Sequence, residues 1–529
     1  MMRIISFSYF DLSPCLKSCL LYLNVFPEDF KIDKEDLIMR WIAEGFTPEE
    51  DGHTLYELGE RCFNELINRS LIQPGELDDL CAEVTNCRVH DIILDFVISK
   101  SKEENFVTLL GVSGVNHDRE NKARRLSLQS GSEIPNDLDL CNAWSLAVFG
   151  RSINIPAWKK FKNLRALSFE MCNELENHHV VGIDNLFHLK HLRFKGAKLK
   201  KFPDEIAKLQ SLETLEIVGA SSRLEIPSTI CQLKKLTHLV VCYYIILPDE
   251  IGGMQALQVL EGINVFNHSV NFCRQLGNLS NLRKLAIELC GNYSVREEKI
   301  IQMLFSICKL GNANLYCVCV SGNYKLDPDL ERYEVDGCNV NDADEIYDGY
   351  NIDDSLDESW FSALRGFREL VIMDNFVPWR IPRSMKSLIN MQKLCLNVSI
   401  VLHEDMVILG GLPALRILSL GAEGCVTGAK TEGLLKISQS LGFPSLINFT
   451  IGERNCVMGL IFEAGCMPRL EKLVLCFLML LTSDDFDFGI EHLRNLKFIR
   501  CHYWKKELKA ALERSIATHP NHPTFQFKG

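Results

Sequence analysis

The sequence contains no apolar run of the roughly 18 residues that a membrane-spanning helix requires; its most apolar stretch is "LEKLVLCFLMLL" (470–481). The first residues, "MMRIISFSYFDLSPCLKS", do not show the charged segment, apolar segment and small-residue cleavage site of a secretory signal peptide. The 21 cysteines include no C-x-x-C pair, and many occupy apolar positions, as in "LYCVCV" (315–320). In a reducing compartment cysteine is simply a small core residue. These absences predict a cytoplasmic protein without a membrane span and disfavour an extracellular receptor.

The chain lacks an excess of positive charge, and its excess of negative charge is concentrated in one place. Between residues 326 and 358 there are 13 acidic residues and one basic residue, so this segment accounts for the whole net charge of −12. The remainder is balanced, which argues against nucleic-acid binding. Within the segment, "DEIYDGYNIDDS" (344–355) does not fit an EF-hand, because Ile346 and Ser355 occupy positions three and twelve. We interpret the segment as a solvated insertion.

One apolar pattern, L-x-x-L-x-L, recurs from about residue 160 onward. It starts at Leu164, Leu189, Leu212, Leu236, Leu257, Leu282, Phe367, Met391, Leu415, Leu470 and Leu496. The first spacings are 21 to 25 residues, which is the period of leucine-rich repeats. Pro203, Pro227, Pro248 and Pro382 each precede a repeat by nine positions. The pattern predicts short parallel strands that share a continuous core, with the proline segments on the convex side.

The x positions of these repeats form a ladder of side chains on the concave face. The candidate partner-binding residues on this ladder are His191, Arg193, Lys195, Thr214, Glu216, His238, Lys284, Glu288, Lys393 and Asn397. With neighbouring rungs such as Val218, Ala286 and Cys395, they mix charged, amide, thiol and aliphatic groups, which is typical of an extended protein-recognition surface rather than of a small-substrate pocket. We predict no catalytic residue and no metal site. No nucleophile–base spacing stands out, and His178-His179 is an isolated pair in a loop.

The first 110 residues differ from the repeats. Apolar residues recur at helical spacing in 11–26, with Asp11 or Ser13 as N-cap, in 33–46, capped by Asp33, and in 54–72. A Pro-Gly turn, a short segment ending in "CRV" (87–89) and a further helix follow. This order predicts a winged-helix domain. Winged helices often bind DNA, but the basic residues here are few and dispersed, which favours protein interaction.

Three stretches resemble one family when read in order: "LKSCLLYLNVFPEDFKIDKEDLIMRWIAEGF" (16–46), "RCFNELINRSLIQP" (61–74) and "CRVHDIILDF" (87–96). Together with the repeats, they resemble plant intracellular immune receptors of the nucleotide-binding leucine-rich repeat class, coiled-coil type. "KARRLSLQ" (122–129) resembles that family's entry into its repeats. The resemblance implies an α/β fold: a winged helix over 1–110, a linker and capping repeat over 111–160, and a repeat solenoid over 161–529. The acidic insertion at about 326–358 interrupts the solenoid.

In that family a Met-His-Asp motif lies in the winged helix, and its His contacts the phosphates of bound ADP. The matching residues here are Val89, His90 and Asp91. The resemblance implies that His90 is an ADP phosphate sensor, that Val89 is its apolar anchor, and that Asp91 caps the following helix and orients the His. The residues alone leave open that His90 is a surface side chain and Asp91 only a cap. A zinc site at His90 is not expected, because no His or Cys lies at ligand spacing.

No segment has the phosphate-binding pattern G-x-x-x-x-G-K-[ST] between a strand and a helix. The nearest stretch, "GAEGCVTGAKTEG" (421–433), has Ala429 before the lysine and follows a repeat strand. We therefore expect the chain to lack the coiled coil and most of the nucleotide-binding core. It should bind no cofactor alone, with ADP or ATP expected only in a full-length family member.

The resemblance implies a plant innate-immunity receptor. Its repeats would recognise a pathogen effector or a guarded host protein, and its winged helix would couple recognition to a nucleotide-controlled switch in defence signalling. An alternative is a stand-alone adaptor or decoy that regulates full-length receptors. A ubiquitin-ligase substrate adaptor is a further alternative, but "WIAEGF" (41–46) and the His90-Asp91 pair argue against it.

Overall fold

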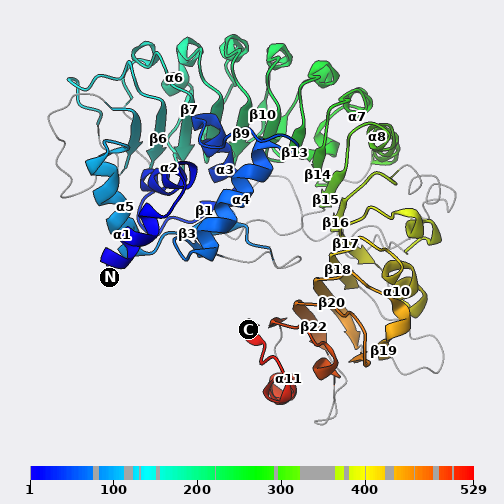
Figure 1. Cartoon of the computed structure of the whole chain (residues 1–529). Helices are drawn as coiled ribbons and strands as arrows, with labels where there is room; N and C mark the ends of the chain where they lie inside the picture. The colour runs from blue at the N-terminus through cyan, green and yellow to red at the C-terminus, as the bar shows by residue number, and fades with distance from the viewer. Residues whose placement is uncertain are drawn as a thin grey trace. The chain divides into compact units, whose positions relative to one another are not determined.

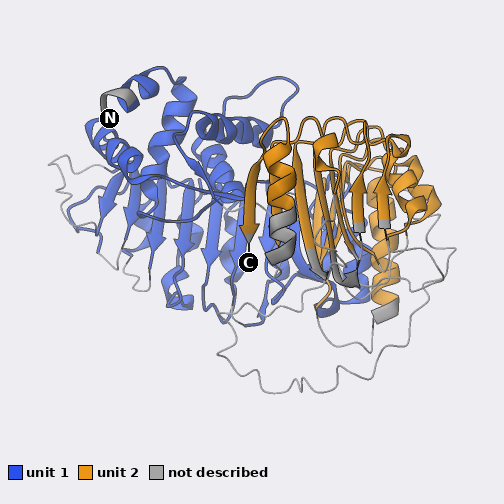
Figure 2. Ribbon diagram, turned by 90° about the horizontal axis from the view of Figure 1, so that it is seen from below, with its two compact units in different colours: residues 1–78, 83–282 blue, residues 79–82, 283–529 orange. Residues whose placement is uncertain are grey.

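The structure is a computed structural model of the 529-residue chain. It describes residues 2–75, 83–111, 123–129, 133–150, 155–220, 222–290, 296–321, 364–373, 381–398, 401–422, 434–457, 459–479, 488–502 and 506–528. The chain divides into two compact units (Figure 2): unit 1 extends to Leu282 and unit 2 begins at Arg283. The expected acidic insertion, with its EF-hand-like stretch, lies outside the described residues, as does the Gly-Ala-Lys-Thr stretch (428–431). Of the helices that the structure describes, none has the length and apolarity to cross a membrane.

Unit 1 begins with a helical domain that carries a small antiparallel sheet. Its helices are α1 (Met2–Phe10), α2 (Pro14–Tyr22), α3 (Lys34–Glu44), α4 (Leu55–Asn68) and α5 (Asp91–Glu103). Its strands β1 (Ile32–Asp33), β2 (Gln73–Pro74) and β3 (Asn86–Arg88) pair in the order β1-β3-β2. The predicted winged helix is confirmed, with β2 and β3 as its wing. Helix α1 is an additional element that the apolar spacing did not indicate.

The helix ends follow the local sequence. Ser13 caps α2 by accepting a hydrogen bond from the Leu16 amide, and Asp33 caps α3 by accepting one from the Asp36 amide at 2.9 Å. Gly45 ends α3 in the left-handed conformation, at φ 78°, which is open to glycine at little cost. Each cap satisfies backbone groups that the helix leaves unpaired.

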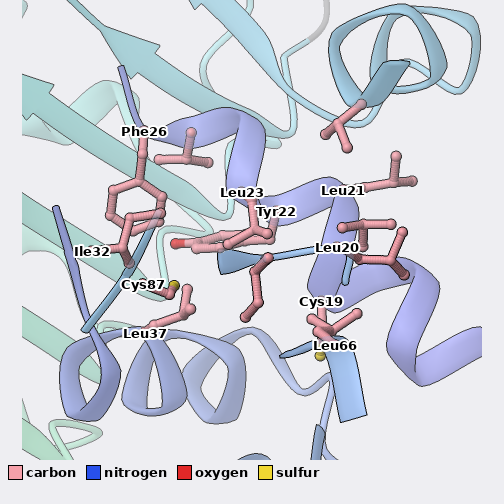
Figure 3. Packing of buried hydrophobic residues seen from close by; sticks show 14 of the residues in the cluster. Cys19, Leu20, Leu21, Tyr22, Leu23, Phe26, Ile32, Leu37, Leu66 and Cys87 are labelled. Atoms are coloured by element: carbon pink, nitrogen blue, oxygen red, sulfur yellow. The ribbon is translucent and has the colours of Figure 1, made fainter. Parts of the chain in front are cut away.

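The helices enclose an apolar core in which Leu20, Leu23, Leu37 and Leu66 meet (Figure 3). Trp41 and Phe63 are fully buried in the same cluster. Burial of each such side chain stabilises the fold by about 1.5–3 kcal/mol. The cluster continues into the repeats through Phe149, whose ring centroid lies 5.3 Å from that of Phe30. The winged helix and the first repeats therefore share one core.

The rest of unit 1 is a parallel sheet with one strand for each repeat. The strands, in spatial and sequence order, are β4 (Thr108–Leu110), β5 (Arg125–Leu128), β6 (Ser145–Phe149), β7 (Ala166–Glu170), β8 (His191–Lys195), β9 (Thr214–Val218), β11 (His238–Val241) and β13 (Val259–Asn264). The returning segments carry short 3-10 helices on the outer side of the sheet (Figure 1), and β10 (Leu224–Glu225) pairs with β12 (Ile245–Ile246) there. Pro203, Pro227 and Pro248 are the N-caps of η4 (Asp204–Lys208), η5 (Ser228–Gln232) and η6 (Asp249–Gly253). The predicted role of the prolines is confirmed.

Unit 2 continues the same architecture. Its parallel strands are β14 (Lys284–Glu288), β15 (Cys317–Ser321), β16 (Glu369–Met373), β17 (Lys393–Val398), β18 (Ile417–Ala422), β20 (Asn448–Val457), β22 (Lys472–Met479), β23 (Phe498–His502) and β24 (Thr524–Lys528). A smaller parallel pair joins β19 (Leu434–Ile437) to β21 (Gly459–Phe462). Helices α8 (Arg296–Gly311), α10 (His403–Gly410) and α11 (Lys506–Thr518) lie in the connections, as does α7 (Val270–Leu276) in unit 1.

The predicted repeats are confirmed, and so are the positions of their strands. Each of the eleven L-x-x-L-x-L matches is followed, two residues after its first apolar residue, by the start of a strand. The eleven matches did not include β4, β5, β6, β15, β20 and β24, although Leu315 and Leu446 begin the same pattern ahead of β15 and β20. Strand β4 lies within the first 110 residues and already pairs with the repeat sheet. The domain boundaries at 110 and 160 stay predictions.

Candidate functional site

Helix α3 lies against the inner face of the strands β7 to β9 (Figure 1). Its amphipathic sequence explains this position. Leu37, Ile38 and Trp41 are buried in the winged-helix core, whereas Asp36 and Arg40, one turn apart, meet the repeats. Met39 lies beside them, with its sulfur 3.9 Å from the hydroxyl of Thr214 on β9. The helix thus carries an apolar stripe and, on its other side, an ionic stripe.

Arg40 is the centre of this contact. Its Nε donates to Asp36 Oδ1 at 2.9 Å, and its Nη2 lies 2.8 Å from Asp36 Oδ2, so the two side chains form a bidentate pair. On the repeats, Nη1 donates to Ser168 Oγ at 2.8 Å, and Nη2 donates to Glu170. The guanidinium also stacks over the Phe26 ring, with its carbon 5.1 Å from the ring centroid. Each of its three guanidinium nitrogens therefore has a partner, and the side chain is only 1% exposed.

Arg193 on β8 contacts the same carboxylates as Arg40, but from the repeats. It donates to Glu216 on β9, its Nε lies 3.2 Å from Glu170 Oε1, and its Nη1 lies 3.6 Å from Asp36 Oδ1. Asp36 and Glu170 are thus shared between the two arginines. We call Asp36, Arg40, Glu170, Arg193 and Glu216 the ionic cluster. Every member is buried, and the cluster joins the winged helix to three successive repeats.

A second ion pair extends the contact. Arg125 on β5 donates through Nε to Glu44 Oε2 at 2.9 Å, and both side chains are buried. The Arg125 guanidinium lies 4.1 Å from the Phe106 ring centroid and 5.0 Å from that of Phe46. Aromatic faces stabilise a cation where water is excluded. The C-terminal end of α3 is therefore held by a pair on β5, and its N-terminal half is held by the ionic cluster.

The protonation of the ionic cluster follows from its charges. It has three carboxyl groups and two guanidinium groups, so one carboxyl proton makes it neutral. Burial raises the pKa of Glu216 to about 8, against the attraction of Arg193, and burial likewise raises the pKa of Glu170. For Asp36 burial acts in the same direction, but Arg193 and Arg40 outweigh it and lower its pKa. At neutral pH the cluster therefore holds an ionised Asp36 and one proton on a glutamic acid, and it carries no net charge.

His191 on β8 completes the buried polar group. Its Nε2 lies 3.6 Å from Asp36 Oδ1, and burial lowers the pKa of the imidazole to about 3. The ring is thus neutral in the folded protein. Asp36, His191 and Glu216 lie close enough to share a metal ion. Because Arg40 and Arg193 already supply positive charge to these carboxylates, the set does not require a cation.

This arrangement corrects part of the predicted recognition surface. His191, Arg193, Thr214 and Glu216 were expected on an open concave face, but each is buried beneath α3. The sequence showed that these residues leave the repeat core, but not that another part of the chain covers them. The other predicted rungs are partly exposed: Lys195 and His238 in unit 1, and Lys284, Glu288, Lys393 and Asn397 in unit 2. For these six residues partner binding stays a prediction.

The sequence did not predict six charged or polar members of the contact: Asp36, Arg40, Glu44, Arg125, Ser168 and Glu170. A weak signal was present, because Asp36 and Arg40 lie four residues apart in a helix whose apolar stripe is elsewhere. Ser168 and Glu170 occupy the x positions of the repeat that starts at Leu164. They precede His191 and Arg193 by one repeat, so the same spacing places them on the concave face.

His90 is exposed at the first turn of α5. It is the N-cap itself, because its Nδ1 accepts a hydrogen bond from the Ile92 amide at 3.4 Å. The prediction that Asp91 caps this helix is wrong, since Asp91 is its first helical residue. In a neutral ring whose Nδ1 accepts, Nε2 carries the proton and can donate. Val89 packs against the winged-helix core.

The residues around His90 fit one phosphate contact but not a whole nucleotide. The hollow that borders Val89 has a cavity volume of only about 10 Å³ and is lined mainly by apolar side chains, among them Leu23, Phe26 and Leu94. Ligand sites for small molecules usually need about 300 Å³ or more. In the described part of the chain, His90 offers a donor without an enclosing site. The sensor role of His90 stays a prediction by resemblance.

Comparisons with known proteins agree with this architecture. The disease resistance protein winged helix domain matches residues 25–97, and the leucine-rich repeat region matches residues 142–525. The chain is 30% identical over 546 residues to the disease resistance protein PIK6-NP of Oryza sativa subsp. japonica, covering 94% of this chain and 49% of that protein. It is 30% identical over 513 residues to the disease resistance protein RGA5 of the same organism, covering 94% and 42% respectively.

The chain spans about half the length of the curated relatives it matches. Within that span, the order of winged helix and repeats agrees with the matched families. The chain belongs to the leucine-rich repeat family; its first domain matches the winged helix domain of disease resistance proteins, and the relatives that match 94% of it are plant disease resistance proteins.

Proposed function

We propose that this chain acts in plant innate immunity as a receptor rather than an enzyme, and that it acts in the cytoplasm. In this proposal the partly exposed rungs of the repeats bind a pathogen effector or a guarded host protein. The winged helix passes that event to a nucleotide-controlled switch, in which His90 contacts the phosphates. Full-length receptors of the same class are further candidate partners. The relatives named disease resistance proteins support this role.

The observation that carries the proposal is the ionic cluster. It joins α3 of the winged helix to β7, β8 and β9, so a ligand that displaced these repeats by a small distance would break buried ion pairs. Buried, hydrogen-bonded pairs depend steeply on geometry, because each charge left alone costs several kcal/mol. The contact therefore has the two properties that coupling needs. It connects the winged helix to the repeats, and a small displacement is enough to break it.

Gene disruption in the plant of origin tests the receptor role. The disrupted line is challenged with a panel of pathogen isolates, and cell death and pathogen growth are scored. We expect at least one isolate that fails on the parent line to grow on the disrupted line. A wild-type transgene should restore resistance. Unchanged growth of every isolate would contradict a receptor role.

A matched pair of transgenes tests the recognition surface. Lys284→Glu with Lys393→Glu reverses two charges on the predicted rungs of unit 2 and should fail to restore resistance. Lys234→Glu with Lys235→Glu makes the same charge change at two exposed lysines outside the strands, and should restore it. Equal restoration by both transgenes would exclude the rungs as the recognition surface while leaving the receptor role intact.

A further inference from the structure

Three cysteine thiols meet where α2 contacts α4. Cys15 and Cys19 lie four residues apart on α2 and so face the same side of the helix, and Cys62 faces them from α4. The Sγ atoms of Cys15 and Cys62 are 3.5 Å apart, and all three Sγ atoms lie within 4.8 Å of one another. We call these residues the thiol cluster. It is separate from the ionic cluster and from His90.

The surroundings of the thiol cluster differ on its two sides. Cys19 is fully buried and lies at the same end of the apolar core as Leu66 (Figure 3), whereas Cys15 and Cys62 are partly exposed. A small ion can therefore reach the sulfurs of Cys15 and Cys62 from solvent, while the apolar core holds the side chain of Cys19 in place. The positive charge of Arg61, the neighbour of Cys62, acts on the cluster from the solvent side.

The thiols are also prepared for ionisation. Cys15 is in the first turn of α2, where unpaired amide groups favour a thiolate. Hydrogen bonds from Cys19 and then from Cys62 lower the pKa of Cys15 to about 3. The hydrogen bond with Cys15 is the main reason that the pKa of Cys62 is raised to about 11. The three thiols thus already lie within hydrogen-bonding reach of one another at the point where their sulfurs converge.

We propose that Cys15, Cys19 and Cys62 bind a zinc ion, with water as the fourth ligand. In a tetrahedral site, zinc–sulfur bonds of about 2.3 Å place the sulfurs about 3.8 Å apart, which lies within the observed spacing. Binding displaces the thiol protons: Zn²⁺ and three thiols give a Zn(S)₃ group of charge −1 and three released protons. The open side at Cys15 and Cys62 leaves room for the water.

A disulfide between Cys15 and Cys62 is the competing use of these residues. It requires an oxidant such as a peroxide, and it leaves the Cys19 thiol without a role. Zinc uses all three sulfurs, and the convergence of the third, buried sulfur favours it. The sequence predicted no metal site because it contains no C-x-x-C pair. The i, i+4 pair of Cys15 and Cys19 became visible as half of a site only when α4 brought Cys62 to it.

The test uses the reduced, metal-free full chain, titrated with Zn²⁺ in competition with a chromophoric chelator. We expect the wild-type chain to bind one more zinc ion than Cys15→Ala or Cys62→Ala. Cys141→Ala, which removes another partly exposed cysteine of unit 1, should match the wild type. Equal zinc stoichiometry in all four proteins would overturn the proposal.

A second measurement needs no variant, so it does not depend on whether a cysteine variant folds. Saturating zinc should slow the alkylation of Cys15 and Cys62 at least tenfold, as read by peptide mass spectrometry, and leave that of Cys141 unchanged. The proposal is overturned if zinc slows the alkylation of neither Cys15 nor Cys62. It is also overturned if peroxide joins Cys15 to Cys62 while zinc gives no protection, because the residues would then be a redox pair.

Discussion

Two sets of repeats in this chain have the same sequence pattern and different surroundings. On β8 and β9 of unit 1, the ladder side chains His191, Arg193 and Glu216 are buried under α3. On β14 and β17 of unit 2, Lys284 and Lys393 occupy the repeat position of His191 and are partly exposed. Both sets read as charged and polar residues at alternating positions of a strand.

The difference lies in what the charges meet. In the ionic cluster each arginine has at least two carboxylate partners, which is the condition for keeping a charge out of water. Partly exposed charges keep much of their hydration, and their contacts contribute about 1 kcal/mol or less. A polar concave rung in a leucine-rich repeat therefore does not by itself identify a surface for an external partner. What surrounds the rung decides whether it stabilises the fold or is available to bind a partner.

The largest effect should come from Arg40→Ala. Removing this guanidinium leaves Asp36 and Glu170 buried with one arginine between them, and we expect a loss of about 3–5 kcal/mol of stability. Denaturant unfolding, with hydrogen exchange of the α3 amides, measures it. Lys284→Ala in unit 2 is the control and should change stability by less than about 1 kcal/mol. Similar losses in the two variants would remove the distinction between the two sets of repeats.

A smaller effect is expected for the pair Arg193 and Glu216, measured by a double-mutant cycle. Arg193→Ala and Glu216→Ala should each destabilise the protein, and the double variant should lose less than their sum. We expect a coupling energy of about 1.5–3 kcal/mol, because the two residues are in direct contact and buried. Additive losses would mean that Arg193 is stabilised by Glu170 and Asp36 alone.

The stability of the ionic cluster should also depend on pH. The folded state keeps a proton on Glu216 up to about pH 8, whereas a carboxyl with its ordinary pKa of 4.5 has lost it. The stability contributed by this proton therefore falls as pH rises between these values. His191 opposes this trend only below its ordinary pKa of 6.5, since its folded pKa is about 3. From pH 6.5 to 8, stability should fall by roughly 1–2 kcal/mol.

Glu216→Gln provides the matched measurement. Glutamine does not titrate, so thermal or denaturant unfolding of this variant should show a flatter profile from pH 6.5 to 8. A fall as steep as in the wild type would assign the titration to another group, with Glu170 as the first candidate because burial raises its pKa as well.

The fold was accessible to sequence reasoning because its signals are periodic. Eleven strands follow from one apolar spacing, and Asp33 and Ser13 cap the helices where they were expected. The site was not accessible in the same way. Asp36 and Glu170 lie far apart in the chain, and only packing brings them to the same arginine. The thiol cluster has the same origin, since Cys62 reaches Cys15 only through the contact of α2 with α4.

The smallest effect concerns His90, which caps α5 from an exposed position. Because its hydrogen bond to the Ile92 amide is long, His90→Ala should cost only about 0.5 kcal/mol of stability. Isothermal titration of the full chain with ADP should detect no binding in either protein, since one donor without an enclosing pocket supplies too little free energy. His90→Asn keeps a capping side chain and should restore the lost stability. If ADP binds the wild type and binding is lost in His90→Ala, His90 is a nucleotide ligand already in this chain, and our account of its surroundings is wrong.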